Sequence, residues 1–347
     1  NTFDYSYENY IKLVLMIYTL SYISPINLTY EKIINQIGEN VLFSTQDLKN
    51  MLKHLLIERE KTTEVYNQFK SSDERMKIYN YNPLRMKPIL KKEEIIYLPM
   101  PHLLFKAITE GFYHWLCSQG KQDRFRRKFG KHVFENYVHH ILQWDDSNYT
   151  IIPEFEYYLG KNLVRSSDFM LVKNSDLVLV EVKSTTPSNK LKGVDIGEYL
   201  KQLEKAYGIA VIQCLKKEKQ LRNGELSHKK IPKNIDKVYY LIITLENFHI
   251  PPSSFMRENI YNICLEEGVE LPDDKDFHAM GVEVLEEILE QDNRDIFQFL
   301  EYREESKHTF ETFPSTDINK DFPLEETKMY KFWKKKLDEI KIIMFGN

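Results

Sequence analysis

The sequence is poor in glycine, with 12 glycines among 347 residues, and none of them forms a glycine-rich phosphate-binding loop. A nucleotide-driven motor is therefore not expected within this chain. Its three cysteines, Cys117, Cys214 and Cys264, lack the spacing of a zinc site. An odd number of scattered cysteines favours reduced thiols and a cytosolic (cytoplasmic) setting.

Long hydrophobic runs are also lacking. The most apolar segment, residues 10–23, contains Lys12 and is followed by Pro25. It falls short of the roughly 20 apolar residues that a membrane-spanning helix needs. We therefore expect a buried helix here and no membrane partner.

An overall excess of one charge is missing too, because the formal net charge is only −4. Residues 121–131 nevertheless hold six Lys or Arg against one Asp, and residues 216–237 hold eight against three acids. Such local patches can bind phosphate groups whatever the total charge. The second stretch is expected to be a solvated loop, unless it borders a nucleic-acid cleft.

The most informative segment consists of two apolar runs, residues 169–172 and 177–182, on either side of a short polar stretch. Both runs are rich in the β-branched and large apolar residues that favour strands. The intervening residues 173–175, Lys-Asn-Ser, are of the kind that closes hairpins. This pattern predicts a β-hairpin.

Polar residues occupy the open end of this apolar hairpin. Asp168 begins the first strand, and Glu181 and Lys183 lie on one face near the end of the second. Two neighbouring carboxylates repel unless a cation or a proton lies between them, and Mg²⁺ accepts such oxygen ligands. A lysine alongside can hold a water and offset charge on a phosphate. This set of side chains suits hydrolysis of a phosphodiester bond.

The pattern of Asp168, twelve further residues and then Glu181-Val182-Lys183 resembles the PD-(D/E)XK nuclease superfamily, which has the restriction-endonuclease-like fold. Ser167 stands where the family name has proline. The resemblance implies that Asp168, Glu181 and Lys183 are catalytic. It implies that Asp168, Glu181 and the carbonyl of Val182 bind Mg²⁺ or Mn²⁺, and that Lys183 positions the attacking water.

A basic amphipathic helix is expected over residues 123–142, before the hairpin. In the superfamily this helix often lends a glutamate to the metal site, and Glu135 matches by position. The alternative is a solvent-facing Glu135 paired with Lys131 one turn earlier. The residues expected to contact nucleic acid come from this helix with the residues just before it, and from two segments after the hairpin, namely a polar loop over residues 185–193 and a long helix over residues 194–216. They are Lys121, Arg124, Arg126, Arg127, Lys190 and Gln202.

Gln202 and Tyr207 resemble the Gln-hydrophobic-x-x-Tyr signature of RecB-type members, but the tyrosine comes one residue late. At about 100° per residue, the two side chains leave a helix in different directions. We therefore expect Gln202 to reach the site and Tyr207 to lie in the core.

These observations predict an α/β protein with a restriction-endonuclease-like core, that is, a mixed central sheet flanked by helices. We expect a mainly helical region over residues 1–92 and the nuclease-like domain over 93–305. Residues 306–347 are expected to form a linker and a C-terminal helix. Strands are expected over residues 93–99, 151–158, 238–245 and 278–282, in addition to the hairpin.

The function expected is that of an Mg²⁺-dependent phosphodiesterase acting on DNA, an endonuclease of a bacterial or phage DNA-processing or antiviral defence system. Its partner is nucleic acid, and both a homodimer and a motor or regulatory partner protein stay open. One alternative is a non-catalytic nucleic-acid- or protein-binding subunit that keeps the fold. Another is a structural protein whose hairpin charges are incidental.

Overall fold

A computed structural model of the chain forms two compact units. The first contains residues 1–122, 192–194 and 328–347, and the second contains residues 123–191 and 195–327. The structure describes residues 5–23, 29–38, 43–68, 82–118, 122–145, 148–186, 201–246, 253–272, 275–290, 295–306 and Lys334.

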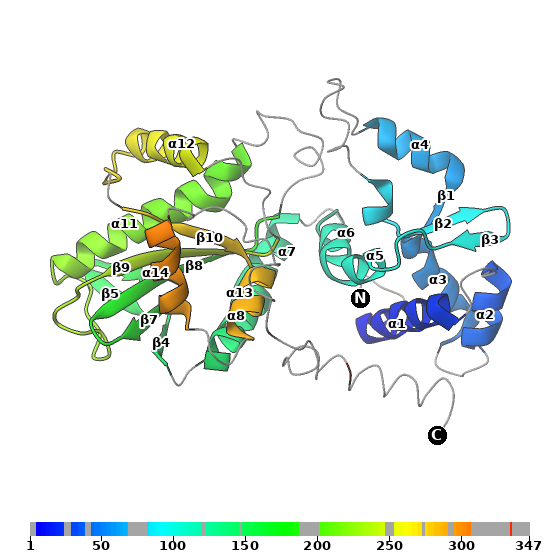
Figure 1. Cartoon of the computed structure of the whole chain (residues 1–347), viewed down its shortest axis with the longest axis horizontal. Coiled ribbons are helices and arrows are strands. Elements are labelled where there is room, and N and C mark those ends of the chain that lie inside the picture. Colours follow the sequence, from blue (N-terminus) through cyan, green and yellow to red (C-terminus); the bar gives the residue numbers. More distant parts are fainter. Residues whose placement is uncertain are drawn as a thin grey trace. The chain divides into compact units, whose positions relative to one another are not determined.

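The first unit combines helices with a small three-stranded sheet of order β1-β2-β3 (Figure 1). Its strands are β1 (Leu56–Glu58), β2 (Ile89–Lys92) and β3 (Ile95–Tyr97). Its helices are α1 (Tyr7–Ile23), α2 (Tyr30–Gly38), α3 (Thr45–Leu55), α4 (Arg59–Gln68), η2 (Pro83–Arg85), α5 (Leu103–Lys106), η3 (Ala107–Gly111) and α6 (Phe112–Ser118). Ser44 caps α3 as expected, since its hydroxyl accepts a hydrogen bond from the Asp47 amide at 3.1 Å.

This unit extends further along the chain than the boundary expected after residue 92. β3 lies in the strand expected over residues 93–99 and pairs with β2, which formed within the region expected to be mainly helical. Leu104 and Ile108 pack in the same hydrophobic cluster as Leu13 of α1. Burial of these side chains attaches residues 95–118 to the first unit.

No helix among the described residues is long and apolar enough to cross a membrane.

The second unit contains a five-stranded sheet of order β10-β9-β8-β7-β4. Its strands are β4 (Thr150–Pro153), β7 (Phe169–Lys173), β8 (Asp176–Lys183), β9 (Val238–Thr244) and β10 (His278–Gly281). β4, β7 and β8 pair antiparallel, whereas β8, β9 and β10 pair parallel. The predicted mixed α/β character is thus confirmed, and the strand expected over residues 278–282 forms β10 at one edge of the sheet (Figure 1).

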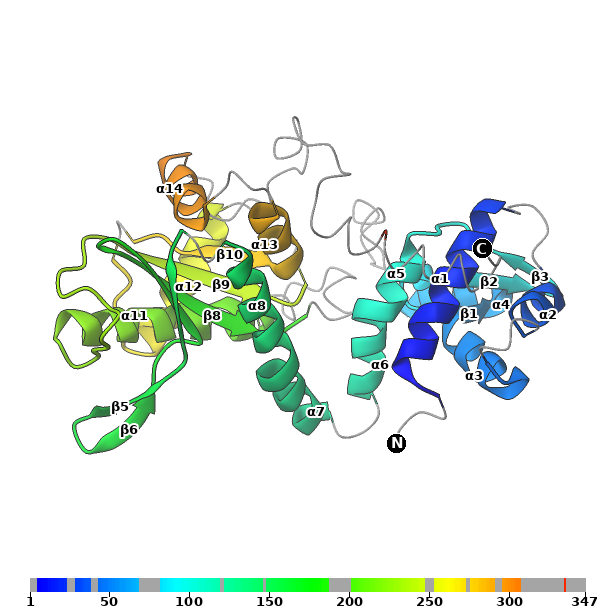
Figure 2. The same cartoon turned by 90° about the horizontal axis from the view of Figure 1, so that it is seen from below.

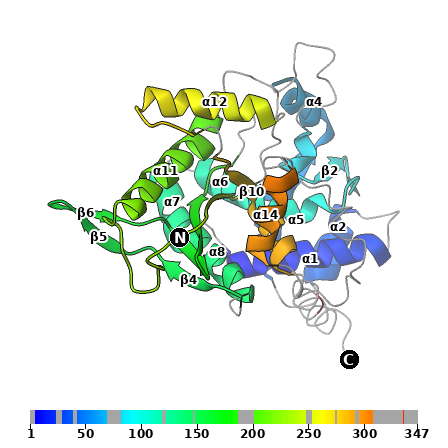
Figure 3. The same cartoon turned by 60° about the vertical axis from the view of Figure 1, so that its left-hand side comes forward.

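Helices cover both faces of this sheet. They are α7 (Gln122–Phe129), η4 (Gly130–Phe134), α8 (Glu135–Leu142), η5 (Gln143–Asp145), η6 (Glu204–Gly208), α11 (Ile209–Arg222), α12 (Ser253–Glu266), α13 (Val282–Leu289) and α14 (Ile296–Ser306). Side chains of α11 and α12 share one hydrophobic cluster with one sheet face, and those of α8, α13 and α14 share another with the opposite face. Figure 3 shows α12 running beside α11.

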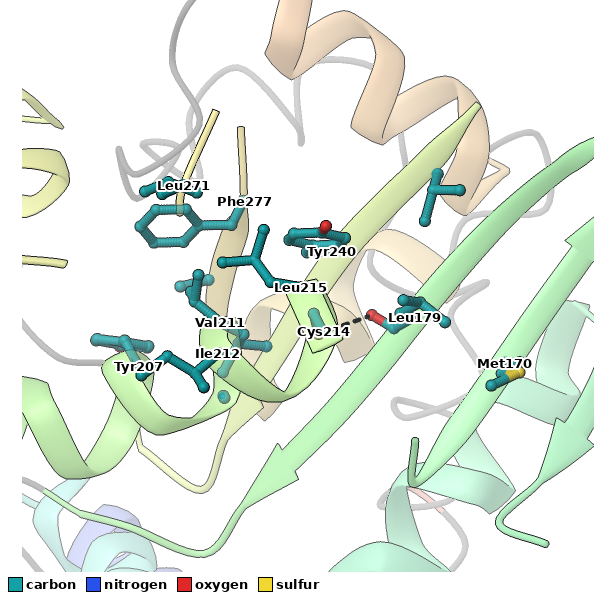
Figure 4. Packing of buried hydrophobic residues seen from close by; sticks show 14 of the residues in the cluster. Met170, Leu179, Tyr207, Val211, Ile212, Cys214, Leu215, Tyr240, Leu271 and Phe277 are labelled. Carbon is teal, nitrogen blue, oxygen red and sulfur yellow. Dashed lines mark hydrogen bonds between the residues drawn. The ribbon is translucent and has the colours of Figure 1, made fainter. Parts of the chain in front are cut away.

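Strand β8 is apolar on both sides because it lies between these two helical layers. Leu177 and Leu179 pack on the α11 side, and Val178 and Val180 pack on the α8 side. Figure 4 shows Leu179 among the side chains of α11, with the Cys214 thiol 4.0 Å from its carbonyl oxygen. Alternation along β8 therefore directs Glu181 and Lys183 toward α11.

Two expectations need correction. Residues 151–158 were expected to form one strand, but the chain leaves the sheet after β4. It then forms a separate antiparallel ribbon of β5 (Glu156–Leu159) and β6 (Asn162–Arg165). The basic stretch 216–237 was expected to be a loop, yet α11 continues through it to Arg222. The expected linker and C-terminal helix lie outside the described residues, apart from Ser306 and Lys334.

Candidate functional site

The hairpin of β7 and β8 brings Asp168 and Glu181 together. Asn174 adopts the left-handed conformation at its turn, with φ 53°. The register pairs Phe169 with Val180 in an antiparallel pair. Asp168, the residue before Phe169, therefore lies opposite Glu181, the residue after Val180. The Asp168 carboxylate accepts a hydrogen bond from the Val182 amide at 2.7 Å. Asp168 is thereby fixed at the end of the sheet, as the sequence predicted.

Lys183 is held between a carboxylate and an amide. Its Nζ donates to Glu181 Oε2 at 2.8 Å and to Gln213 Oε1, also at 2.8 Å. Gln213 lies on α11, and the sequence analysis did not identify it. The available signal was its place on the helix expected over residues 194–216, one side of which faces the core. The same helix places the buried Cys214 next to Gln213.

Burial of this cluster changes the acidity of its members. Burial raises the pKa of Glu181 to about 7, and the Asp168 charge acts in the same direction against Lys183. Burial likewise raises the pKa of Asp168, although Lys183 and the Val182 amide oppose it. Burial alone would lower the pKa of Lys183, but Glu181 and Asp168 outweigh it and raise that pKa. Lys183 therefore acts as a cation rather than as a base.

A second charged group adjoins the first. Lys131 Nζ lies 3.0 Å from Glu135 Oε2 and 2.6 Å from Glu154 Oε2. Burial raises the pKa of Glu135, and the charge of Asp168 adds to this effect while Lys131 opposes it. Glu135 thus makes the ion pair with Lys131 that is expected of a helical surface residue, and its pKa also depends on the charge of Asp168. Its role as a metal ligand stays a prediction.

The π-helical turn η4 carries the start of α8 against the end of β8. A Cβ atom on Gly130 would lie 2.8 Å from the hydroxyl oxygen of Ser184, the residue after Lys183. The absent side chain permits this close approach. π-Helical turns inside helices are frequently found at functional sites. This one lies just before Glu135 in the chain.

The residues expected to contact nucleic acid are placed only in part. Arg126 and Arg127 are exposed on α7, while the side chain of Arg124 lies outside the described portion. Lys121 and Lys190 also fall outside the described residues. Gln202 is buried just before η6, and Tyr207 is a core residue as predicted.

The donor set at the end of β8 suits a hard divalent cation. Burial opposes the ionisation of both carboxylates, and the charge of Asp168 adds to this effect at Glu181, so a positive ion between them would favour the ionised forms. Within the described ranges, no three His, Cys, Asp or Glu side chains gather as a metal site. Mg²⁺ commonly uses one or two carboxylates and keeps several waters, so Asp168 and Glu181 fit its needs.

Comparisons with known proteins add no identification. No protein-family model matches the chain. No curated protein matches it either. The functional argument therefore depends on the geometry of the site.

Proposed function

We propose that this protein is a metal-dependent nuclease of the PD-(D/E)XK type that hydrolyses phosphodiester bonds in DNA. The observation that carries the proposal is the position of Lys183, a half-buried cation 2.8 Å from the Glu181 carboxylate and adjoining Asp168. Two acids and a lysine converge at one sheet end. Together these groups can hold a metal ion and offset charge on a phosphate, which suits a metal-dependent phosphodiesterase.

The order of elements gives further support. A helical segment, α7 to α8, precedes three antiparallel strands, and α11 leads to the parallel strand β9. A restriction-endonuclease-like core has this order. Fold alone does not define function, so the proposal depends on the residues at the sheet end.

Each residue has a proposed role. Asp168 and Glu181 would hold Mg²⁺ or Mn²⁺ with the Val182 carbonyl, while the Val182 amide keeps the Asp168 carboxylate in place. The bound ion would supply Lewis acidity for activating water and for offsetting charge on the phosphate. Lys183 is kept protonated by Glu181 and Asp168 and is oriented by its hydrogen bond to Gln213. It would hold the attacking water and stabilise the developing negative charge.

Two groups of residues would assist. Glu135 would add a ligand if its ion pair with Lys131 opened, because that pair now occupies its carboxylate. Arg126 and Arg127, exposed on α7, would hold backbone phosphates together with Lys121, Arg124 and Lys190. Phosphate contacts of this kind predict binding that weakens steeply with salt and depends little on sequence.

The setting that we propose is bacterial or phage DNA processing or antiviral defence. We expect the protein to be an endonuclease, with a homodimer or a motor or regulatory protein as the open partner choices. The alternative is a non-catalytic nucleic-acid- or protein-binding subunit that retains the fold.

Supercoiled plasmid tests this proposal. We expect the full chain to nick or linearise the plasmid with Mg²⁺ and, separately, with Mn²⁺, and to stop when EDTA is added. The reason is that cleavage needs the divalent ion that Asp168 and Glu181 would hold, and EDTA removes that ion from solution. Gel electrophoresis over time measures the conversion. Plasmid that is bound but stays supercoiled with both ions would contradict catalysis and favour the binding subunit.

A further inference from the structure

The β5–β6 ribbon projects from the sheet at the end where the candidate site lies. The chain leaves the sheet after Pro153 and returns directly before Asp168, so the site residues Glu154 and Asp168 bracket the ribbon. The Glu154 amide donates to the Asp168 carbonyl at 2.9 Å across its base. Figures 2 and 3 show the ribbon extending beyond the five-stranded sheet.

One face of the ribbon is supported by α11. The Tyr157 hydroxyl donates to Gln220, and Lys217 Nζ lies 3.0 Å from the same hydroxyl. Lys217 also donates to the carbonyl of Arg165 on the second strand. These contacts attach the inner face of the ribbon to α11.

The opposite face is open. Tyr158 and Leu163 are cross-strand partners on it, and they are 70% and 54% exposed. Arg165 lies on the same face and pairs with Glu156 at 3.7 Å. Lys161, exposed in the two-residue turn, carries a second positive charge at the tip. An apolar pair is thus flanked along the ribbon by two cations.

This outer face is continuous with the candidate site. The Arg165 guanidinium lies 3.6 Å from Glu154 Oε2, and Lys131 holds that same carboxylate next to Glu135. A substrate strand that crosses the site would therefore meet Arg165 first and the apolar pair beyond it. An exposed aromatic side chain between cations is the chemistry that stacks on bases while the cations hold phosphates.

We propose that the outer face of the β5–β6 ribbon binds an unpaired base of the substrate DNA strand, at a short distance along the strand from the phosphate to be cleaved. Tyr158 stacks on the base with Leu163 beneath it, and Lys161 and Arg165 contact the flanking phosphates. This inference depends on the proposed function, which it deepens by naming a substrate with single-stranded character. The preferred DNA is thus a tailed or locally opened duplex.

The test is equilibrium binding of the full chain to fluorescein-labelled duplexes, one blunt and one with a single-stranded tail, with Ca²⁺ replacing Mg²⁺. We expect Tyr158→Ala to bind the tailed duplex between about 5- and 150-fold more weakly, the range for loss of one base stack. Tyr158→Phe is expected to keep wild-type affinity. Tyr302→Ala, which removes another exposed tyrosine, on α14, is the matched control. A 2-aminopurine in the tail reports stacking directly, and its quenching should be lost in Tyr158→Ala.

Equal affinity of the wild type, Tyr158→Ala and Leu163→Ala for tailed DNA would overturn this inference, and plasmid cleavage by the same wild type would leave the proposed function standing. Tail binding that depends on Tyr158, without any plasmid cleavage, would support base binding by the ribbon and contradict the proposed nuclease activity. A wild type that binds neither duplex would overturn both. Loss of a dimer in Tyr158→Ala with unchanged DNA affinity, seen by sedimentation, would instead assign the face to contact between copies.

Discussion

Replacing Lys183 by alanine is expected to slow plasmid cleavage by about 10²–10³-fold or more, the cost of removing a preorganised charge from a phosphoryl centre. The Lys183 ammonium lies 2.8 Å from both Glu181 and Gln213, so no neighbouring cation can take its place without moving. Lys131, the other lysine near Asp168, is occupied by Glu135 and Glu154. Initial rates of nicking at saturating Mg²⁺ measure the effect.

The control for this variant is Lys205→Ala, which removes an exposed lysine of η6 in the same unit. It is expected to cleave at the wild-type rate. The thermal midpoint and circular dichroism of Lys183→Ala should show an intact fold, because Glu181 can bind a proton once the ammonium is gone. Full cleavage by a folded Lys183→Ala protein would remove Lys183 from the mechanism.

The second large effect concerns stability. Burial raises the pKa of Glu181 from 4.5 to about 7, so the folded protein binds a proton there more tightly than the unfolded chain does. The resulting stabilisation is complete below about pH 4.5 and is lost as the pH rises through about 7. Glutamine imitates the protonated acid at every pH. Glu181→Gln is therefore expected to be more stable than the wild type at pH 8, by between about 1 and 3 kcal/mol.

Urea unfolding at pH 5, 7 and 8 tests this effect. The difference between Glu181→Gln and the wild type should be largest at pH 8 and shrink toward pH 5. Glu156→Gln, at an exposed carboxylate of the ribbon, is the matched control and should show no such trend. Mg²⁺ at pH 8 should stabilise the wild type but not Glu181→Gln. A Glu181→Gln protein less stable than the wild type at pH 8 would contradict the assigned direction.

The central features of the fold followed from local patterns. The two apolar runs and the turn residues around Asn174 were sufficient to predict the β7–β8 hairpin, and the two-residue spacing placed Glu181 and Lys183 on one face. Asp168 could be placed beside them because a hairpin fixes its own register. These inferences needed no contact between segments distant in the sequence.

The features that the sequence did not predict depend on contacts between segments that are far apart in the chain. Gln213 meets Lys183 across the packing of α11 on β8, and no local pattern marks that contact. The division between β4 and β5 depends on where the chain leaves the sheet, so alternation over residues 151–158 looked like one strand. The placement of β3 with the first unit depends on its pairing with β2. No strand was predicted at β2, because two of its four residues are lysines.

The most direct measurement of the central claim is Mn²⁺ binding at the end of β8. Mn²⁺ would be titrated into the full chain in the presence of phosphorothioate DNA, which resists cleavage, with free Mn²⁺ followed by electron paramagnetic resonance. The wild type is expected to bind Mn²⁺ saturably, and Asp168→Asn at least about tenfold more weakly. A wild type with no more affinity than Asp168→Asn would mean that the hairpin charges are incidental, and the nuclease proposal would be contradicted.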